Sequence, residues 1–363
     1  MDKTFRRSLL GAAVAMAAVS GSANAAIELA GEAVQIYGQA AASYQFWDPA
    51  GTGKEQSAGV EVESRIGFRG VVEFDNFAPN FVWQIESGNA NNRDSGTDPW
   101  NKYHGILGGR DTYVGFQFED VGTVTFGRRT IAVYDYVDWP HTNPGLGNVF
   151  DWNNAIGADY ETRADNVLRF DSANFGGFNF QATLSGMGAD TEQAVVSVAG
   201  SYTGSNFSVH GGHYAQGGWT ETTEDSYKFD TETGEKELVE GETAKKGDVS
   251  YSLIGGSVWF GKATFTAGYK MMDNDRDNTS QNALSVTAAY WLNDQWLAKV
   301  GYAQSMDSNA SDKDDTSTAM SARLLYSLPS MVIYFDARNY EMLNDKDHAD
   351  SGTRFMLGTE YYF

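Results

Sequence analysis

Large apolar and polar residues alternate along most of the chain. In the segment 60–74, Ile66 and Phe68 fall on one parity, and the charged Glu63 and Arg65 fall on the other. A β-strand sends successive side chains to opposite faces. The pattern therefore predicts a strand with one apolar face and one charged face.

The same pattern recurs sixteen times without a helical segment between the repeats. The predicted strands are 34–47, 60–74, 81–88, 106–118, 123–129, 166–172, 178–187, 194–202, 207–216, 249–260, 263–272, 282–292, 296–304, 317–328, 331–340 and 353–363. Short turns alternate with long polar connections, and the segment 188–193 is the one short exception. Such alternation predicts an up-and-down meander with one short rim and one elaborate rim.

A closed barrel of sixteen strands is too wide for side chains to fill, so its polar face is predicted to line water. The apolar face is predicted to contact lipid, where every backbone group must be paired. The last strand fits this reading, because Phe355, Leu357, Tyr361 and Phe363 share the outward parity. The expected fold is an all-β, transmembrane, antiparallel barrel.

Aromatic residues cluster near the predicted strand ends, where amphipathic rings suit the lipid headgroup zone. These residues are Tyr37, Trp83, Trp259, Trp291, Trp296, Tyr326, Tyr340 and Tyr361. Packing beneath loops is the alternative role for each of them.

The N-terminus has a basic start, an apolar middle and the triplet Ala23-Asn24-Ala25, which is typical of a secretory signal peptide. We expect residues 1–25 to be removed and residues 26–363 to form the barrel domain. Cleavage takes away three basic residues and one acidic residue, leaving 23 and 47 and a net charge of −24. That charge argues against nucleic acid as a partner.

Other chemistry is less well supported. The chain has no cysteine, which excludes disulfides and thiolate metal sites. His210 and His213 lie three apart on a strand, so they point to opposite faces and are not expected to share a metal ion. Asp273, Asp275 and Asp277 have the spacing of a Ca²⁺ loop but lack its glycine and its final glutamate. No enzymatic constellation is recognised, and no cofactor is expected.

Several motifs together give the chain a family resemblance. They are "IYGQAAASY" in the first strand, "SRIGFRG" in the second, "EDVGTVTFGRR" before the third long loop, "TRADNVLRF" after it, and a terminal phenylalanine. In this order and spacing they resemble the general diffusion porins of Gram-negative bacteria. The resemblance implies a homotrimer of sixteen-stranded barrels in the outer membrane, each narrowed by a third loop that folds inward.

The resemblance also implies roles for individual residues. The basic wall of the constriction is expected at Arg65, Arg110 and Arg163, and a basic position of the family is Gln39 here. The acids expected on the third loop are Asp135, Asp138, Asp151, Asp159 and Glu161. This loop departs from the family pattern, since Gly145 replaces an acid and His141 stands where another acid is expected.

Contacts with other molecules follow from the same resemblance. Arg128 matches an arginine that meets the neighbouring subunit, with Asp94 or Asp98 as its expected partner. Phe363 resembles the signal read by the barrel-assembly machinery. Outer-membrane lipid and lipopolysaccharide are the expected surroundings, and small hydrophilic solutes are the expected cargo.

Two functions remain open at this point. The first is general passive diffusion, with a weak cation preference because the segment 217–248 carries ten carboxylates against four lysines. The second is a channel specific for sugar or phosphate, a possibility raised by the third-loop aromatics Tyr134, Tyr136, Trp139 and Trp152.

Overall fold

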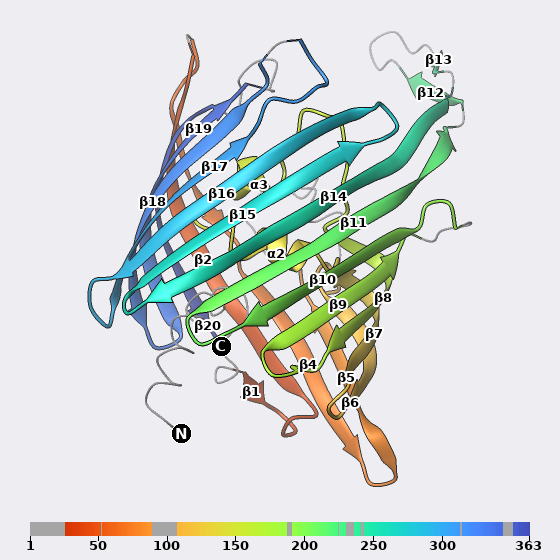
Figure 1. Ribbon diagram of the computed structural model, residues 1–363, viewed down its shortest axis with the longest axis vertical. Helices are drawn as coiled ribbons and strands as arrows, with labels where there is room; N and C mark the ends of the chain where they lie inside the picture. The colour runs from red at the N-terminus through yellow and green to blue at the C-terminus, as the bar shows by residue number, and fades with distance from the viewer. Residues whose placement is uncertain are drawn as a thin grey trace.

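The strands close into one antiparallel barrel (Figure 1). The computed structural model describes residues 26–51, 53–88, 107–186, 191–223, 225–229, 236–239, 241, 243–312, 314–343 and 351–363. The predicted signal peptide, 1–25, and the loop 89–106, which contains Asp94 and Asp98, lie outside the described residues.

Sixteen strands make up the wall when β3 and β4 are counted as the two halves of one broken strand. In chain order these are β2 (Gln35–Pro49), β3 (Ser57–Val62) with β4 (Arg65–Phe74), β5 (Phe77–Glu86), β6 (Thr112–Phe118), β7 (Gly122–Thr130), β8 (Arg163–Ser172), β9 (Phe178–Ser185), β10 (Val195–Thr203), β11 (Phe207–Thr222), β14 (Thr243–Phe260), β15 (Ala263–Asn274), β16 (Thr279–Trp291), β17 (Trp296–Ser305), β18 (Ser317–Leu328), β19 (Met331–Met342) and β20 (Gly352–Tyr362). A short β1 (Ile27–Glu28) pairs with β2.

The barrel is sealed where its first and last strands meet. β20 pairs with β19 on one side and with β2 on the other, from Gln39 opposite Tyr362 to Pro49 opposite Gly352. The predicted sixteen-stranded barrel is therefore confirmed. Among the described residues, no helix is long and apolar enough to cross a membrane.

The two faces of the wall follow the predicted alternation. In β20, Phe355, Leu357 and Tyr361 are exposed on the outside, whereas Met356 and Tyr362 are buried on the inside. The outer side chains of a closed barrel contact lipid in a membrane, so their apolar character is the expected one.

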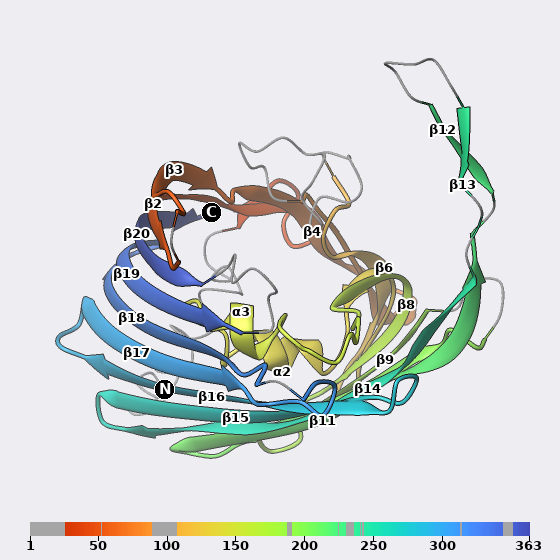
Figure 2. The ribbon, with the colours of Figure 1, turned by 90° about the horizontal axis from the view of Figure 1, so that it is seen from above.

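Some predicted boundaries and placements were wrong. β6 begins at Thr112 rather than at 106. The connection 217–248 is largely strand, because β11 and β14 continue as a hairpin that ends in the small sheet of β12 (Ser226–Phe229) and β13 (Lys236–Val239) and projects away from the barrel (Figure 2). Two aromatics expected at the lipid surface face inward, since Tyr37 donates a hydrogen bond to Glu86 and Tyr340 donates one to Gly145.

The third long loop, 131–162, is called L3 here, and it folds into the lumen as predicted (Figure 2). It contains two short helices, α2 (Tyr134–Asp138) and α3 (Gly147–Phe150). The buried apolar core lies between L3 and the inner wall. Its L3 members include Ile131, Val133, Val137, Leu146, Val149 and Phe150, each at most 1% exposed.

Candidate functional site

Three arginines predicted for the basic wall lie together in the lumen. Arg65 comes from β4, Arg110 precedes β6, and Arg163 is the first residue of β8. Their guanidinium groups are within electrostatic range, because both Arg65 and Arg163 act on Arg110. Three like charges in one place need compensating acids.

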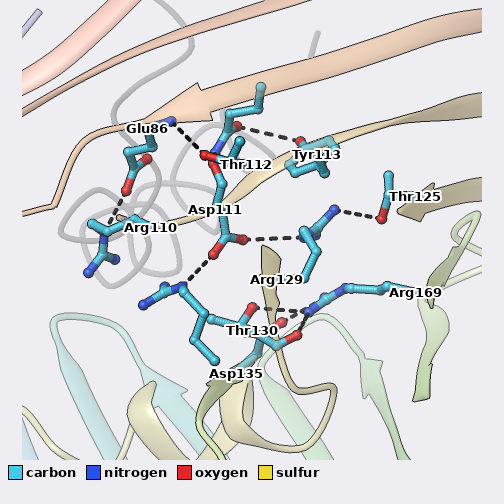
Figure 3. Close-up of polar contacts among 12 residues, drawn as sticks. Glu86, Arg110, Asp111, Thr112, Tyr113, Thr125, Arg129, Thr130, Asp135 and Arg169 are labelled. Atoms are coloured by element: carbon cyan, nitrogen blue, oxygen red, sulfur yellow. Dashed lines mark hydrogen bonds and ion pairs between the residues drawn. The ribbon is translucent and has the colours of Figure 1, made fainter. Parts of the chain in front are cut away.

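The compensating acids come from the wall itself and were not foreseen from the sequence (Figure 3). Arg110 Nε lies 2.5 Å from Glu86 Oε1, and Arg163 Nε lies 2.6 Å from Asp111 Oδ1. Arg129 also contacts Asp111, at 3.2 Å, so one carboxylate bridges two arginines. Glu86 is the last residue of β5, and Asp111 directly follows Arg110 in the sequence. The position of Asp111 next to a predicted wall arginine was the signal available in the sequence.

Arg65 has a different partner. Its Nη2 atom donates a hydrogen bond of 2.7 Å to Gln39 Oε1 on β2. A neutral amide leaves the guanidinium charge uncompensated at this contact, in contrast to Arg110 and Arg163. Arg65 is therefore the member of the wall with the least local pairing to an acid among the described contacts.

Asp135 and Asp138 lie on α2, and they have different environments. Asp135 Oδ2 is 2.7 Å from Nη2 of Arg169 (Figure 3). The same Nη2 atom lies 2.6 Å from Asp171 Oδ1. Asp138 lies in the field of Arg110 and Arg163, although burial raises the pKa of its carboxyl. Asp138 is thus the predicted L3 acid that interacts electrostatically with two arginines of the basic wall.

Asp151 lies between L3 and the wall. Its carboxylate accepts a hydrogen bond from the Tyr134 hydroxyl at 3.0 Å, and its main-chain oxygen accepts one from Lys270 Nζ at 2.9 Å. Desolvation raises the pKa of Asp151 to about 7, and the Lys270 ammonium opposes that rise.

Asp159 and Glu161 lie on the segment of L3 that returns to the wall. Glu161 accepts a hydrogen bond from Ser185 at 3.1 Å, and burial raises its pKa. Asp159 borders a cavity of about 180 Å³ between L3 and the wall, together with Trp152 and Tyr160. Asp138 differs from these two acids, because it interacts electrostatically with Arg110 and Arg163.

The wall facing the turn of L3 carries a second charged group that sequence reasoning missed. Asp336 is fully buried and holds Arg323 at 2.7 Å and Arg338 at 2.6 Å. Tyr340 on the same strand donates a 2.8 Å hydrogen bond to the carbonyl oxygen of Gly145. Period-two alternation places these side chains inward, but it carries no information on which of them L3 will contact.

The two residues expected to contact other molecules lie at the edges of the site. Arg128 contacts Asp165 at 3.0 Å and donates a hydrogen bond to the Gly109 carbonyl oxygen. The main-chain atoms of Phe363 pair with those of Gly38, at 2.8 and 3.1 Å.

Comparison with known proteins agrees with this architecture. The family model for Gram-negative porins matches residues 12–341. Over 380 aligned positions that cover both chains completely, the sequence is 33% identical to a protein of Vibrio furnissii named chitoporin.

Solved porins share the fold. An anion-selective porin from Comamonas acidovorans aligns with a TM-score of 0.68 at 17% identity, covering 91% of this chain and 99% of that one. OmpF of Salmonella typhi, solved in complex with daunomycin, gives 0.65 at 17% identity, with 93% and 100% covered. The trimer form of Vibrio cholerae OmpT gives 0.63 at 17% identity, with 91% and 99% covered. The chain therefore belongs to the Gram-negative porin family of outer-membrane β-barrels.

Proposed function

We propose that the chain forms a water-filled channel for passive diffusion of small hydrophilic solutes and ions. The observation that supports this proposal is the inward fold of L3, which brings Asp138 within electrostatic range of Arg110 and Arg163 (Figure 2). Opposed charges create a field across the lumen and hold ordered water. A polar solute aligns with that field, whereas an apolar solute has to displace the water without replacing its hydrogen bonds.

Liposome swelling tests this function. Proteoliposomes are diluted into isotonic solutions of uncharged sugars of increasing mass, with protein-free liposomes as the control. We expect swelling rates that fall smoothly with solute size and do not saturate with concentration. Absence of swelling with the smallest sugars contradicts channel function.

A second candidate is a channel specific for oligosaccharides, favoured by the relative named chitoporin. Aromatic rings that stack on sugar faces are available on L3. Trp152 is 53% exposed, and Trp139 lies 5.5 Å from Lys299 Nζ. A specific channel predicts that one oligosaccharide blocks the ion current at micromolar concentration, while an isomer of equal mass does not. Replacement of Trp152 by alanine then weakens that block.

Ion preference belongs to the same proposal. The acidic segment 217–248 is expected to attract cations to the side of the barrel from which its hairpin projects, which gives a weak cation preference. The reversal potential of a planar bilayer in a salt gradient measures the sign directly. A clear chloride preference contradicts this part of the proposal and leaves the channel function intact.

Maturation and assembly complete the proposal. Residues 1–25 are removed on export, the barrel-assembly machinery reads Phe363, and three copies associate in lipid and lipopolysaccharide with Arg128 at the subunit contact. Mass spectrometry of the membrane form is expected to place the N-terminus at Ala26. Electrophoresis without heating is expected to show a trimer that heating converts to monomer, and a monomer under both conditions contradicts the trimer. We propose no enzymatic activity.

A further inference from the structure

His141, near the middle of L3, is completely buried and meets a histidine of the barrel wall. Its Nε2 atom lies 2.8 Å from Nε2 of His210 on β11. The ring of Tyr136 stacks on His210 at 5.0 Å, and the ring of Phe150 tilts against His141 at 5.4 Å. The two imidazoles are therefore enclosed by L3 on one side and by the wall on the other.

The wall provides a socket for the His141 ring because two of its residues have no side chain. A Cβ atom at Gly255 on β14 would lie 2.5 Å from His141 Nε2, and one at Gly268 on β15 would lie 2.6 Å from Cε1. Ser285 on β16 donates a 2.7 Å hydrogen bond to the carbonyl oxygen of His141. Three neighbouring strands thus fix both the ring and the backbone of this residue.

The hydrogen bond between the rings requires the accepting imidazole to be neutral, and the buried Nδ1 of His141, unpaired among the described residues, favours a neutral donor as well. One Nε2 has to donate a proton and the other has to accept it, because a neutral imidazole has one donor and one acceptor nitrogen. Nδ1 of His141 is buried and has no hydrogen-bond partner among the described residues. An unpaired lone pair is tolerated better than an unpaired N–H group, so the geometry favours His141 as the donor.

Proton uptake by either ring disrupts this arrangement. A proton on Nδ1 of His141 creates a buried charged donor without an acceptor, and a proton on Nε2 of His210 removes the acceptor of the shared bond. Burial accordingly lowers the pKa of His141 to about 3, with His210 and Lys299 acting in the same direction. The neutral pair is the form that this site stabilises.

We propose that His141 is a positioning residue of the channel, whose neutral contact with His210 latches L3 to the wall and opens when acid protonates the imidazoles. The latch fixes the part of L3 that directly follows α2. Because α2 carries Asp138, the latch helps to set the width of the constriction. This inference rests on the channel function proposed above.

The surrounding ionisable groups define what an experiment has to control. They are His210 on β11, Lys299 on β17, and Tyr136 and Asp138 on α2. Lys270 on β15 and its partner Asp151 lie on the far side of the Phe150 ring. Asp151 titrates in the opposite direction to His141, because its pKa is raised. A variant that removes only the His141 proton site therefore has to be compared with the parent at every pH.

The sign of the expected pH dependence follows from the lowered pKa. Released L3 binds a proton at His141 below about pH 6.5, whereas latched L3 binds it only below about pH 3. The His141 contribution to the released-to-latched ratio therefore rises about tenfold for each pH unit of acidification within that window, and it is constant above it.

Single-channel recording between pH 7.5 and 4.5 tests the latch, with the rate of brief partial closures as the readout. The ratio of the parent's closure rate to that of His141→Gln is expected to be at least tenfold larger at pH 4.5 than at pH 7.5, because the opposite titration of Asp151 is common to both proteins. His141→Gln is the reference for this ratio, because an amide presents either an oxygen or an NH₂ group to His210 and takes up no proton. His213→Gln, on the exposed outer side of the same strand as His210, is the matched control and is expected to behave like the parent.

Gly268→Ala provides a second, independent variant. It leaves every ionisable group in place but fills the socket, so it is expected to raise the closure rate at pH 7.5 at least tenfold above that of the parent. Heat-modifiable migration in gels confirms that each variant has folded. A ratio of parent to His141→Gln closure rates that is flat with pH overturns the latch. A preparation that conducts no ions contradicts the channel function instead.

Discussion

Lys270 provides a quantitative test of how L3 is anchored. It points from β15 toward α3, is 2% exposed, and donates a 2.9 Å hydrogen bond to the main-chain oxygen of Asp151. Its ammonium group also lies 5.6 Å from the ring of Phe150 and 5.8 Å from the ring of Tyr251. Replacement by methionine keeps the apolar stem and removes the charge and the donor.

The expected cost is that of one hydrogen bond from a charged group, about 2 kcal/mol. Breaking a buried ion pair usually costs more, about 3–5 kcal/mol, because a charge is left unpaired. Here the carboxyl can take up a proton instead, since the pKa of Asp151 is already raised to about 7 and rises further without the ammonium. A cost of about 2 kcal/mol corresponds to about 30-fold more frequent release of this part of L3.

Hydrogen–deuterium exchange of the peptide 147–158 measures that release. In Lys270→Met at pH 7 we expect exchange about 30-fold faster than in the parent, with unchanged exchange in the strands. Lys262→Met is the matched control, because Lys262 is exposed in a turn. Exchange that accelerates less than threefold, or equally in the control, refutes the anchoring role of Lys270.

The exchange rate of the same peptide is also expected to change with pH, and the direction of that change can be checked. The pKa of Asp151 is higher in the anchored loop than its ordinary value of 3.8, so its contribution to anchoring is complete below about pH 4 and is lost as the pH rises through about 7. Exchange corrected for the intrinsic chemical rate is therefore expected to quicken between about pH 4 and 7. In Asp151→Asn this dependence is expected to disappear.

Three further predictions follow from other contacts. Asp138→Asn removes the L3 carboxylate that faces Arg110, so the reversal potential in a salt gradient is expected to move toward anion preference; a shift toward cations contradicts the assigned geometry. Tyr340→Phe removes the hydrogen bond to Gly145, which costs about 1 kcal/mol and speeds amide exchange in 143–146 about fivefold; unchanged exchange contradicts that anchoring contact. Deletion of Phe363 is expected to lower the yield of heat-modifiable trimer in the membrane without lowering synthesis, and an undiminished yield argues against its role as an assembly signal.

The number of strands and the inward or outward direction of their side chains were predictable, because alternation is a local property with a period of two. The same property assigned Arg65 to the inner face, whereas Arg110 and Arg163 were expected beside it only from the family resemblance. Strand ends were less predictable. The broken second strand shows why, since Ser64 bonds through its side chain to the backbone of Ala41 and interrupts the ladder between β3 and β4.

The course of L3 was not predictable, because it follows no repeating pattern and is fixed by contacts with distant strands. Nothing around Asp135 indicates that Arg169 will hold it, and Lys270 lies 119 positions from Asp151. His141 was noticed as a substitution for an expected acid, and its importance became apparent only with His210 opposite. Contacts of this kind depend on the register of the whole barrel.

The seam between β2 and β20 has a consequence for biogenesis. Eleven paired positions join these strands, yet Gln39 and Tyr362 are separated by nearly the whole polypeptide. Bringing such remote ends together costs about 5 kcal/mol of chain entropy, which is recovered only when the last strand docks. Until then β2 presents an unsatisfied row of amide and carbonyl groups that a neighbouring unfinished copy can capture. Misassembled oligomers are avoided if hairpins associate one after another and the barrel closes in a single last step. A template that shields the β2 edge until then favours this route.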